Sequence, residues 1–409
     1  MKSIIQFKAI TPPLVIITVA LLCLAATGSR VQAVTPPPDG GYPGGNTAEG
    51  QHALLSRTTG GFNAAIGWLS LRGLTNGSFN TGVGAGTLAL NNADQNTATG
   101  AGALLSNTIG SFNTAHGAFA LFTNTEGGGN TATGLQSLFH NTIGNANTAT
   151  GEAALFNNSS GNDNTANGDS TLVNNVTGEG NVAIGSQALH SNTAGSANTA
   201  VGGGALFSST GTGNIAIGFN AGNNVSTANS VICIGLPGQD VSTSCYIGNI
   251  FNVTSSGGTA VFINSDGKLG TTTSSKRFKK EIKPMDKASE AIFALKPVSF
   301  RYTKDVDRAG TSQLGLVAED VEKVSPDLVV RDKEGKPYSV RYDQVNAMLL
   351  NEFLKEHRKN EEQQATIAQL KKEMETVVAR LKEQDSEIQR VSAQIEVSKA
   401  VGQTALNNP

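Results

Sequence analysis

A short segment near residue 275 holds the side chains of this chain that are best suited to chemistry. It reads Thr-Ser-Ser-Lys-Arg-Phe-Lys-Lys from residue 273. A serine hydroxyl attacks a peptide carbonyl only when a base removes its proton, and lysine is such a base only as the neutral amine. Ser274 and Lys279 form one possible pair of this kind among the two serines and three lysines of the segment. The cations Lys276, Arg277 and Lys280 favour the neutral amine by like-charge repulsion.

The spacing of this pair sets a condition on the fold. A spacing of five residues does not place two side chains on the same face of a regular helix or strand. The pair therefore requires a bend in the chain, or a lysine from a second copy. The alternative is a basic, solvated linker in which Ser274 caps the following turn.

The segment divides the chain into two compositions. The part before it is rich in Gly, Asn, Thr and Ala, and the part after it is charged and non-repetitive. Over all 409 residues, 48 glycines and 5% aromatic residues argue against a single large core. A net charge of -2 argues against nucleic-acid binding. The five histidines are dispersed, so the sequence predicts neither a metal site nor a cofactor.

The N-terminus has the order of a secretory signal. Basic residues precede an apolar run of about 13 residues, which is shorter than a bilayer span, and small residues follow. We expect a signal peptide over residues 1–33 and an exported protein, secreted or at the cell surface. Residues 34–45 are a Pro/Gly linker.

Two cysteines remain after the predicted signal. Cys233 and Cys245 lie 12 residues apart, and export would place them in an oxidising compartment. A small disulfide loop and two free thiols are both compatible with the sequence.

Residues 46–235 repeat with a period of 17 residues, shortened twice to 16. Glycine always follows the first Asn of each unit by four residues, and Leu follows it by eight residues in ten of eleven units. Most units between residues 107 and 192 add a second Asn turn. The first Asn of each unit stands at 46, 63, 80, 96, 113, 130, 147, 164, 181, 198 and 214.

Such a unit has room for two short extended segments and two corners, and it lacks the apolar stripe of a helical repeat. One Leu cannot form a core alone, so the units must stack. Glycine at a fixed phase indicates positive φ or close backbone approach. We expect a mainly β parallel β-solenoid or β-roll, followed by a β stem over residues 236–273.

The C-terminal part has ordinary helix and strand patterns. Residues 274–360 predict a small α+β domain, in which Asp286 and Asp343 cap helices. A coiled coil over residues 361–398 and a polar tail over 399–409 follow. Ile367, Met374, Leu381, Ile388 and Ile395 recur every seven residues, with Leu370, Val377, Gln384, Val391 and Ser398 at the other seam position. The alternative is a single amphipathic helix packed on its own domain.

The repeats resemble the heads of trimeric autotransporter adhesins, through units such as Asn-Val-Ala-Ile-Gly at residue 181 and Asn-Ile-Ala-Ile-Gly at residue 214. In those proteins similar units form a parallel β-roll that trimerises. The resemblance implies an adhesin-like homotrimer, with a surface glycan or a protein as ligand of the repeats. The period here is longer than in those heads.

The C-terminal part resembles the chaperone-of-endosialidase family of intramolecular auto-processing domains. Four blocks match in order: residues 274–282, residues 294–302, residues 315–321 and Tyr342 before a long helix. The resemblance implies trimerisation through C-terminal helices, folding of the β-structure upstream, and self-cleavage by a serine autoprotease that acts once on its own chain. It assigns Ser274 as nucleophile, Lys279 as base and Arg277 as support, whereas Ser275 replaces the family's usual Asp.

Two other functions stay open. A glycan-processing solenoid needs a pair of carboxylates in a groove, but the acidic residues of the repeats are scattered. A structural stalk would keep the C-terminal domain as a permanent trimerisation clamp without cleavage.

Overall fold

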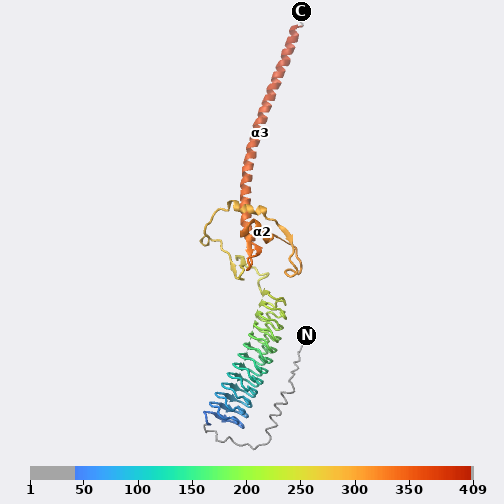
Figure 1. Ribbon diagram of the computed structural model, residues 1–409. Helices are drawn as coiled ribbons and strands as arrows, with labels where there is room; N and C mark the ends of the chain where they lie inside the picture. Colours follow the sequence, from blue (N-terminus) through green and yellow to red (C-terminus); the bar gives the residue numbers. More distant parts are fainter. Residues whose placement is uncertain (1–41, 407–409) are drawn as a thin grey trace, which may run out of the picture. The chain divides into compact units, whose positions relative to one another are not determined.

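The computed structural model describes residues 42–406, with the side chains described through residue 399. The predicted signal peptide and most of the predicted linker lie outside the described residues. The described chain has two compact units, divided after Thr254. Figure 1 shows a stack of short strands in the first unit and the long helix α3 in the second.

The first unit is a parallel β-solenoid, as predicted. Thirteen strands of three residues each form one sheet in sequence order, and every neighbouring pair is parallel. The strands are β1 (Thr47–Glu49), β2 (Ala64–Ile66), β3 (Thr81–Val83), β4 (Thr97–Thr99), β5 (Thr114–His116), β6 (Thr131–Thr133), β7 (Thr148–Thr150), β8 (Thr165–Asn167), β9 (Val182–Ile184), β10 (Thr199–Val201), β11 (Ile215–Ile217), β12 (Ile232–Ile234) and β13 (Cys245–Ile247).

The solenoid core consists of alanine and leucine columns. The middle residue of nearly every strand is an alanine such as Ala149, and the leucine four residues beyond the fixed glycine, such as Leu155, is also buried. The ten leucines have φ between 50° and 52°, a left-handed conformation that the sequence did not predict. This conformation costs about 1–2 kcal/mol per residue. Burying the side chain contributes about 1.5–3 kcal/mol, so burial outweighs the backbone strain.

The glycine at the fixed phase fulfils both predicted roles. Its φ lies between 117° and 138° in all eleven units. A Cβ on Gly151 would stand 2.4 Å from the carbonyl oxygen of Gly168 in the next coil. No side chain fits between coils at this level, so the spacing of the coils depends on these glycines.

Buried asparagines form two ladders along the solenoid. The backbone N and the Nδ2 of Asn130 donate to Oδ1 of Asn113 at 3.0 and 3.1 Å, and Nδ2 also donates to the Gly144 carbonyl at 2.8 Å. In the second ladder, Nδ2 of Asn124 donates to Oδ1 of Asn107 at 2.6 Å. Each asparagine side chain thus accepts hydrogen bonds from the asparagine of the next coil. These bonds offset the free-energy cost of burying the polar amide groups.

The second ladder ends where the repeat changes. Asn192 is fully buried, and its Oδ1 has no hydrogen-bond partner among the described residues. The next position along this ladder is Ser209, whose hydroxyl accepts a hydrogen bond from Asn214 instead. Because serine is shorter than asparagine, it does not continue the ladder.

The solenoid extends beyond its predicted end at residue 235. Strand β13 pairs in register with β12, although the connecting loop is shorter than a repeat. In this loop the Asp240 carboxylate accepts hydrogen bonds from the backbone N of Ser226, Thr227 and Ala228 and from the Ser226 hydroxyl. These bonds hold the pKa of Asp240 well below its ordinary value.

The two cysteines are free thiols in this structure. Cys245 is in register with Ile232, whereas Cys233 is in register with Tyr246. Cys233 is consequently buried inside the coil, and Cys245 is exposed on the outer face of the sheet. Their side chains point to opposite faces, so of the two readings that the sequence left open the structure has the unpaired one. Burial raises the pKa of the Cys233 thiol.

The second unit contains three short antiparallel sheets and several helices. The first of these sheets belongs to the predicted stem, which is therefore divided between the two units. The elements are β14 (Val261–Ile263), β15 (Leu269–Thr271), the 3-10 helices η1 (Lys276–Phe278), η2 (Asp286–Ala294) and η3 (Pro326–Leu328), β16 (Val298–Phe300), β17 (Gln313–Gly315), α2 (Ala318–Val324), β18 (Val329–Arg331), β19 (Pro337–Val340) and α3 (Tyr342–Leu406).

The predicted caps of the second unit differ in the structure. Asp286 does not cap η2, because Met285 holds the N-cap position and makes no side-chain bond. The Asp286 carbonyl instead accepts a hydrogen bond from Nδ2 of Asn351 at 3.2 Å. Asp343 lies inside the first turn of α3, where a carboxylate is favourable to the helix dipole.

Helix α3 is continuous over 65 residues, a length of about 100 Å. Every described side chain from residue 356 to residue 399 is exposed, including the apolar heptad positions. The helix is therefore not packed on its own domain over this range, which contradicts the alternative of a single packed amphipathic helix. Among the described residues, no helix combines the length and the apolar character needed to cross a membrane.

We predict that Asn130→Ala destabilises the solenoid by about 1–3 kcal/mol, because the change leaves buried amides without an acceptor. Oδ1 of Asn130 accepts bonds from the backbone N and Nδ2 of Asn147. Asn145→Ala is the matched control, since its Oδ1 accepts a bond from the Gly128 backbone N in contact with water. Urea unfolding followed by circular dichroism measures both. Equal effects would contradict the importance of the ladder.

We predict that Gly151→Ala is more destabilising than Gly180→Ala. At Gly180, φ is 63° and no atom lies within 4 Å of an added Cβ, so the change costs about 1–2 kcal/mol from the left-handed backbone. At Gly151 the methyl group meets the Gly168 carbonyl, and the coils must separate. Thermal unfolding of the two variants decides the order, and equal melting temperatures would show that the coils adjust without cost.

Candidate functional site

The candidate serine and lysine lie on either side of a single turn. The chain leaves β15 at Thr271, and Ser275 is extended, with φ -63° and ψ 135°. Helix η1 then forms because the backbone N of Phe278 donates to the Ser275 carbonyl at 3.0 Å. The backbone N of Lys279 donates to the Lys276 carbonyl at 3.1 Å. This turn supplies the bend that the spacing of five residues requires.

The turn brings the two side chains into contact within one chain. Nζ of Lys279 donates to Oγ of Ser274 at 3.0 Å. This distance lies within the range expected for a nucleophile and its base. Of the two alternatives left open by the sequence, the structure has the bend in the same chain.

Ser274 does not cap the following turn, contrary to the linker interpretation. The N-cap position of η1 belongs to Ser275, which makes no side-chain cap bond. Arg277 lies over the ring of Phe278, with its Cζ 4.6 Å from the ring centroid. Arg277 therefore contacts an aromatic ring in this chain and does not touch Ser274 by any hydrogen bond among the described residues.

The surroundings of the pair are open to water. Ser274, Lys279 and all residues between them are exposed. An ammonium group donates hydrogen bonds and accepts none. The present contact therefore orients the hydroxyl, and proton abstraction requires surroundings that exclude water from the amine.

Contacts between residues far apart in sequence stabilise the domain that follows this turn in the chain. The Tyr342 hydroxyl accepts a hydrogen bond from the backbone N of Leu316 at 2.9 Å. A Cβ on Gly315 would stand 2.9 Å from the same hydroxyl. Glycine at this position thus lets the start of α3 approach β17, which links two of the sequence blocks that resemble the family.

A polar cluster that the sequence did not reveal joins η2 to α3. Ser289 is fully buried, and its hydroxyl donates to Oε1 of Glu352 and accepts a bond from Nδ2 of Asn351 at 2.7 Å. Nζ of Lys355 lies 2.7 Å from the same Glu352 oxygen. The Lys355 and Ser289 bonds lower the pKa of Glu352. No local pattern connects residues more than 60 positions apart, so only the structure shows this cluster.

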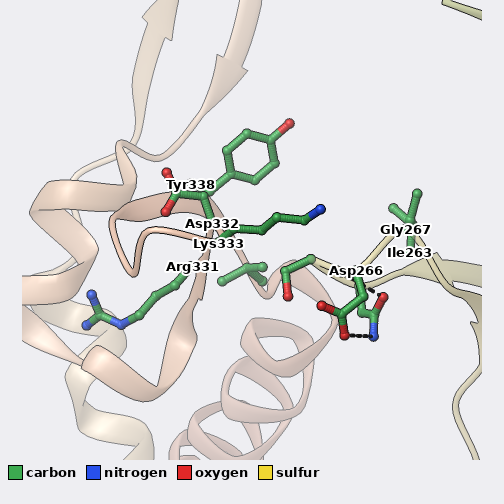
Figure 2. A pocket seen from close by; sticks show the side chains of 10 residues that line it. Ile263, Asp266, Gly267, Arg331, Asp332, Lys333 and Tyr338 are labelled. Atoms are coloured by element: carbon green, nitrogen blue, oxygen red, sulfur yellow. Dashed lines mark hydrogen bonds between the residues drawn. The ribbon is translucent and has the colours of Figure 1, made fainter. Parts of the chain in front are cut away.

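A pocket of about 360 Å³ lies between the turn after β14 and the β18–β19 hairpin. Figure 2 shows Asp266 and Gly267 on one side, and Arg331, Asp332 and Tyr338 on the other. Its charged groups support turns: Asp332 accepts bonds from the backbone N of Glu334 and of Lys336. Neither Ser274 nor Lys279 lines it, so this pocket and the candidate pair are separate features.

The described residues contain no group of three or more His, Cys, Asp or Glu side chains that could hold a metal ion. A chemical function of this chain is argued from the Ser-Lys pair, and a pair of this kind needs neither metal nor cofactor.

Comparison with protein families matches residues 274–330 to the family described as chaperone of endosialidase. The match begins at the candidate nucleophile itself and ends within β18. No curated protein and no solved structure matches the chain. C-terminal to a parallel β-solenoid of repeats, this chain therefore has a chaperone-of-endosialidase domain at residues 274–330.

Proposed function

We propose that this protein is an exported homotrimeric fibre whose C-terminal domain is an intramolecular chaperone that trimerises the chain and then cuts it near Ser274. The chaperone-of-endosialidase domain indicates an intramolecular chaperone in a fibre-like protein. The proposal of cleavage rests on the 3.0 Å contact between Lys279 Nζ and Ser274 Oγ.

The exposed heptad seam of α3 supports assembly. Eight apolar seam residues between Ile367 and Ile395 are each 45% to 67% exposed in the single chain. A helix of this length obtains most of its stability from packing of an apolar face. Helices from other copies of the chain are the natural partners for a seam with this heptad repeat.

The small core of the second unit supports assembly as well. Only five apolar side chains of its described part are buried: Val321, Leu328, Val329, Val340 and Met348. Large apolar side chains stay exposed, among them Leu314 at 86% and Phe293 at 74%. So small a core contributes little stability to one copy, and burial between copies would supply more.

A chaperone of this kind solves a registration problem. Repeats of nearly equal sequence can pair in wrong registers, and a wrong pairing buries almost the same residues. A clamp that holds three chains in the same register reduces the entropy cost of forming the first correct contacts between repeats. The solenoid repeats can then stack from that end.

The proposed cleavage proceeds in ordinary steps. The Ser274 Oγ attacks a flanking peptide carbonyl while the neutral Lys279 amine accepts the hydroxyl proton. The same proton passes to the departing amine as the peptide bond breaks and an ester forms. Water then hydrolyses the ester. Burial of the pair by other copies favours the neutral amine, which couples cutting to completed assembly.

The non-cleaving stalk is the second candidate function. Ser275 stands where the resembled family usually has Asp, and the pair is exposed in the single chain. In that case the domain is a permanent clamp. A glycan or protein ligand of the repeats remains a prediction from the sequence in either case.

We predict that the purified protein splits near residue 274 and that Ser274→Ala remains whole, because the variant lacks the nucleophile. Ser275→Ala is the matched control with the neighbouring hydroxyl removed, and it should still be cut. Lys279→Gln should block cutting, whereas Lys280→Gln should not. Intact mass spectrometry after folding measures all five proteins. An uncut wild type that has assembled would favour the permanent clamp.

We predict that Leu381→Asp converts the assembled chain into single copies, because three carboxylates would be buried together at one level of the seam. Ala379→Asp places the same charge on the same helix outside the seam and should leave the assembly intact. Light scattering on the Ser274→Ala background gives the mass of the whole chain. A mass of one chain for Ser274→Ala without a further change would overturn the trimer.

A further inference from the structure

The outer face of the solenoid sheet changes its chemistry along the stack. The first and third residues of each strand point outward, because the middle residue is buried. From β4 to β8 the ten outward residues are eight threonines, His116 and Asn167. From β9 to β13 they are Val182, Ile184, Thr199, Val201, Ile215, Ile217, Ile232, Ile234, Cys245 and Ile247.

The second group forms an apolar face, called here the β9–β13 face. Seven of its isoleucines and valines are between 36% and 45% exposed, and all five strands are paired in register. Threonine hydroxyls can bond to water, but these side chains cannot. A contiguous apolar face on a protein surface in water marks an interaction site.

We propose that the β9–β13 face is a contact between copies of this chain, while the threonine-bearing strands β4 to β8 remain free of such contact. The inference rests on the proposed trimer and adds where the solenoids touch.

The face itself points to a second copy as its occupant. It carries no charged residue, so two equal faces meet without burying an unpaired charge. Parallel heptad helices hold identical chains at the same phase, so that each coil meets the same coil of its neighbour. A face of isoleucine and valine then packs against an equal one, as in self-complementary symmetric contacts.

The position of the face in the sequence agrees with this occupant. It occupies the last coils before the C-terminal unit, and only residues 248–260 connect β13 to β14. Holding the C-terminal units together raises the effective concentration of coils joined by so short a connection. The coils of β4 to β8, which are further from the C-terminal unit, gain less, and their outward residues are polar.

A consequence concerns the proposed cut at Ser274. Cleavage would separate the solenoid from α3 and hence from the helical clamp. The β9–β13 face lies on the solenoid side of the cut, so after cleavage the contact between solenoids would no longer have the support of the helical clamp.

Cys245 is a native probe of this face, since it is exposed there in the single chain. We predict that in assembled Ser274→Ala protein a maleimide labels Cys245 about tenfold or more slowly than a cysteine introduced by Thr133→Cys, because labelling requires opening of the contact. Peptide mass spectrometry follows each site separately. Equal labelling rates in a protein whose mass is that of an oligomer would overturn the inference and leave the trimer intact.

Two pairs of substitutions sharpen the test. Ile217→Lys with Ile234→Lys should make Cys245 label rapidly while the coiled coil keeps the oligomeric mass. Thr133→Lys with Thr150→Lys, at the same strand position in β6 and β7, should leave labelling slow. In Leu381→Asp, which removes the other copies, Cys245 should label rapidly. Slow labelling in that variant would show that the face is covered by its own chain and would overturn the proposal.

Discussion

The hydrogen bond from one buried asparagine to the asparagine of the next coil is the interaction on which the solenoid depends. A buried amide without a partner costs more than a made bond contributes. Here the acceptor of each amide is the same residue one repeat away, as in Asn130 and Asn113. A slip of one residue would break many such bonds at once. The ladder therefore sets the register of the sheet, and the glycine and leucine columns keep their positions because of it.

A regular interior leaves the exterior free to vary. The glycines are restricted by the carbonyl of the next coil and the leucines by burial in the core. The outward residues of each strand meet no such restriction. One scaffold can thus carry threonines over some strands and isoleucines over others.

The C-terminal unit follows the opposite principle. It has few buried apolar residues, and its longest helix exposes an apolar seam. Its contacts, such as Tyr342 with Leu316 and Ser289 with Glu352, join residues far apart in sequence. In the proposed assembly, other copies would complete this unit. In that assembly, burial by other copies would also remove water from Ser274 and Lys279, so the proposed cleavage would depend on assembly.

The sequence by itself determined the solenoid, the position of the glycines and leucines within each repeat, and the continuous C-terminal helix. A repeated pattern imposes the same physical constraint in every unit, so it can be recognised without the structure. The sequence also offered Ser274 and Lys279 as a candidate pair, which required either a bend in the chain or a lysine from a second copy. Only the tertiary structure decided that η1 supplies that bend within one chain. It alone revealed the left-handed leucines, the thiols on opposite faces of the sheet and the extra strand β13. These features occur once or depend on neighbouring coils, and the energy of such contacts is fixed by packing that no local pattern expresses.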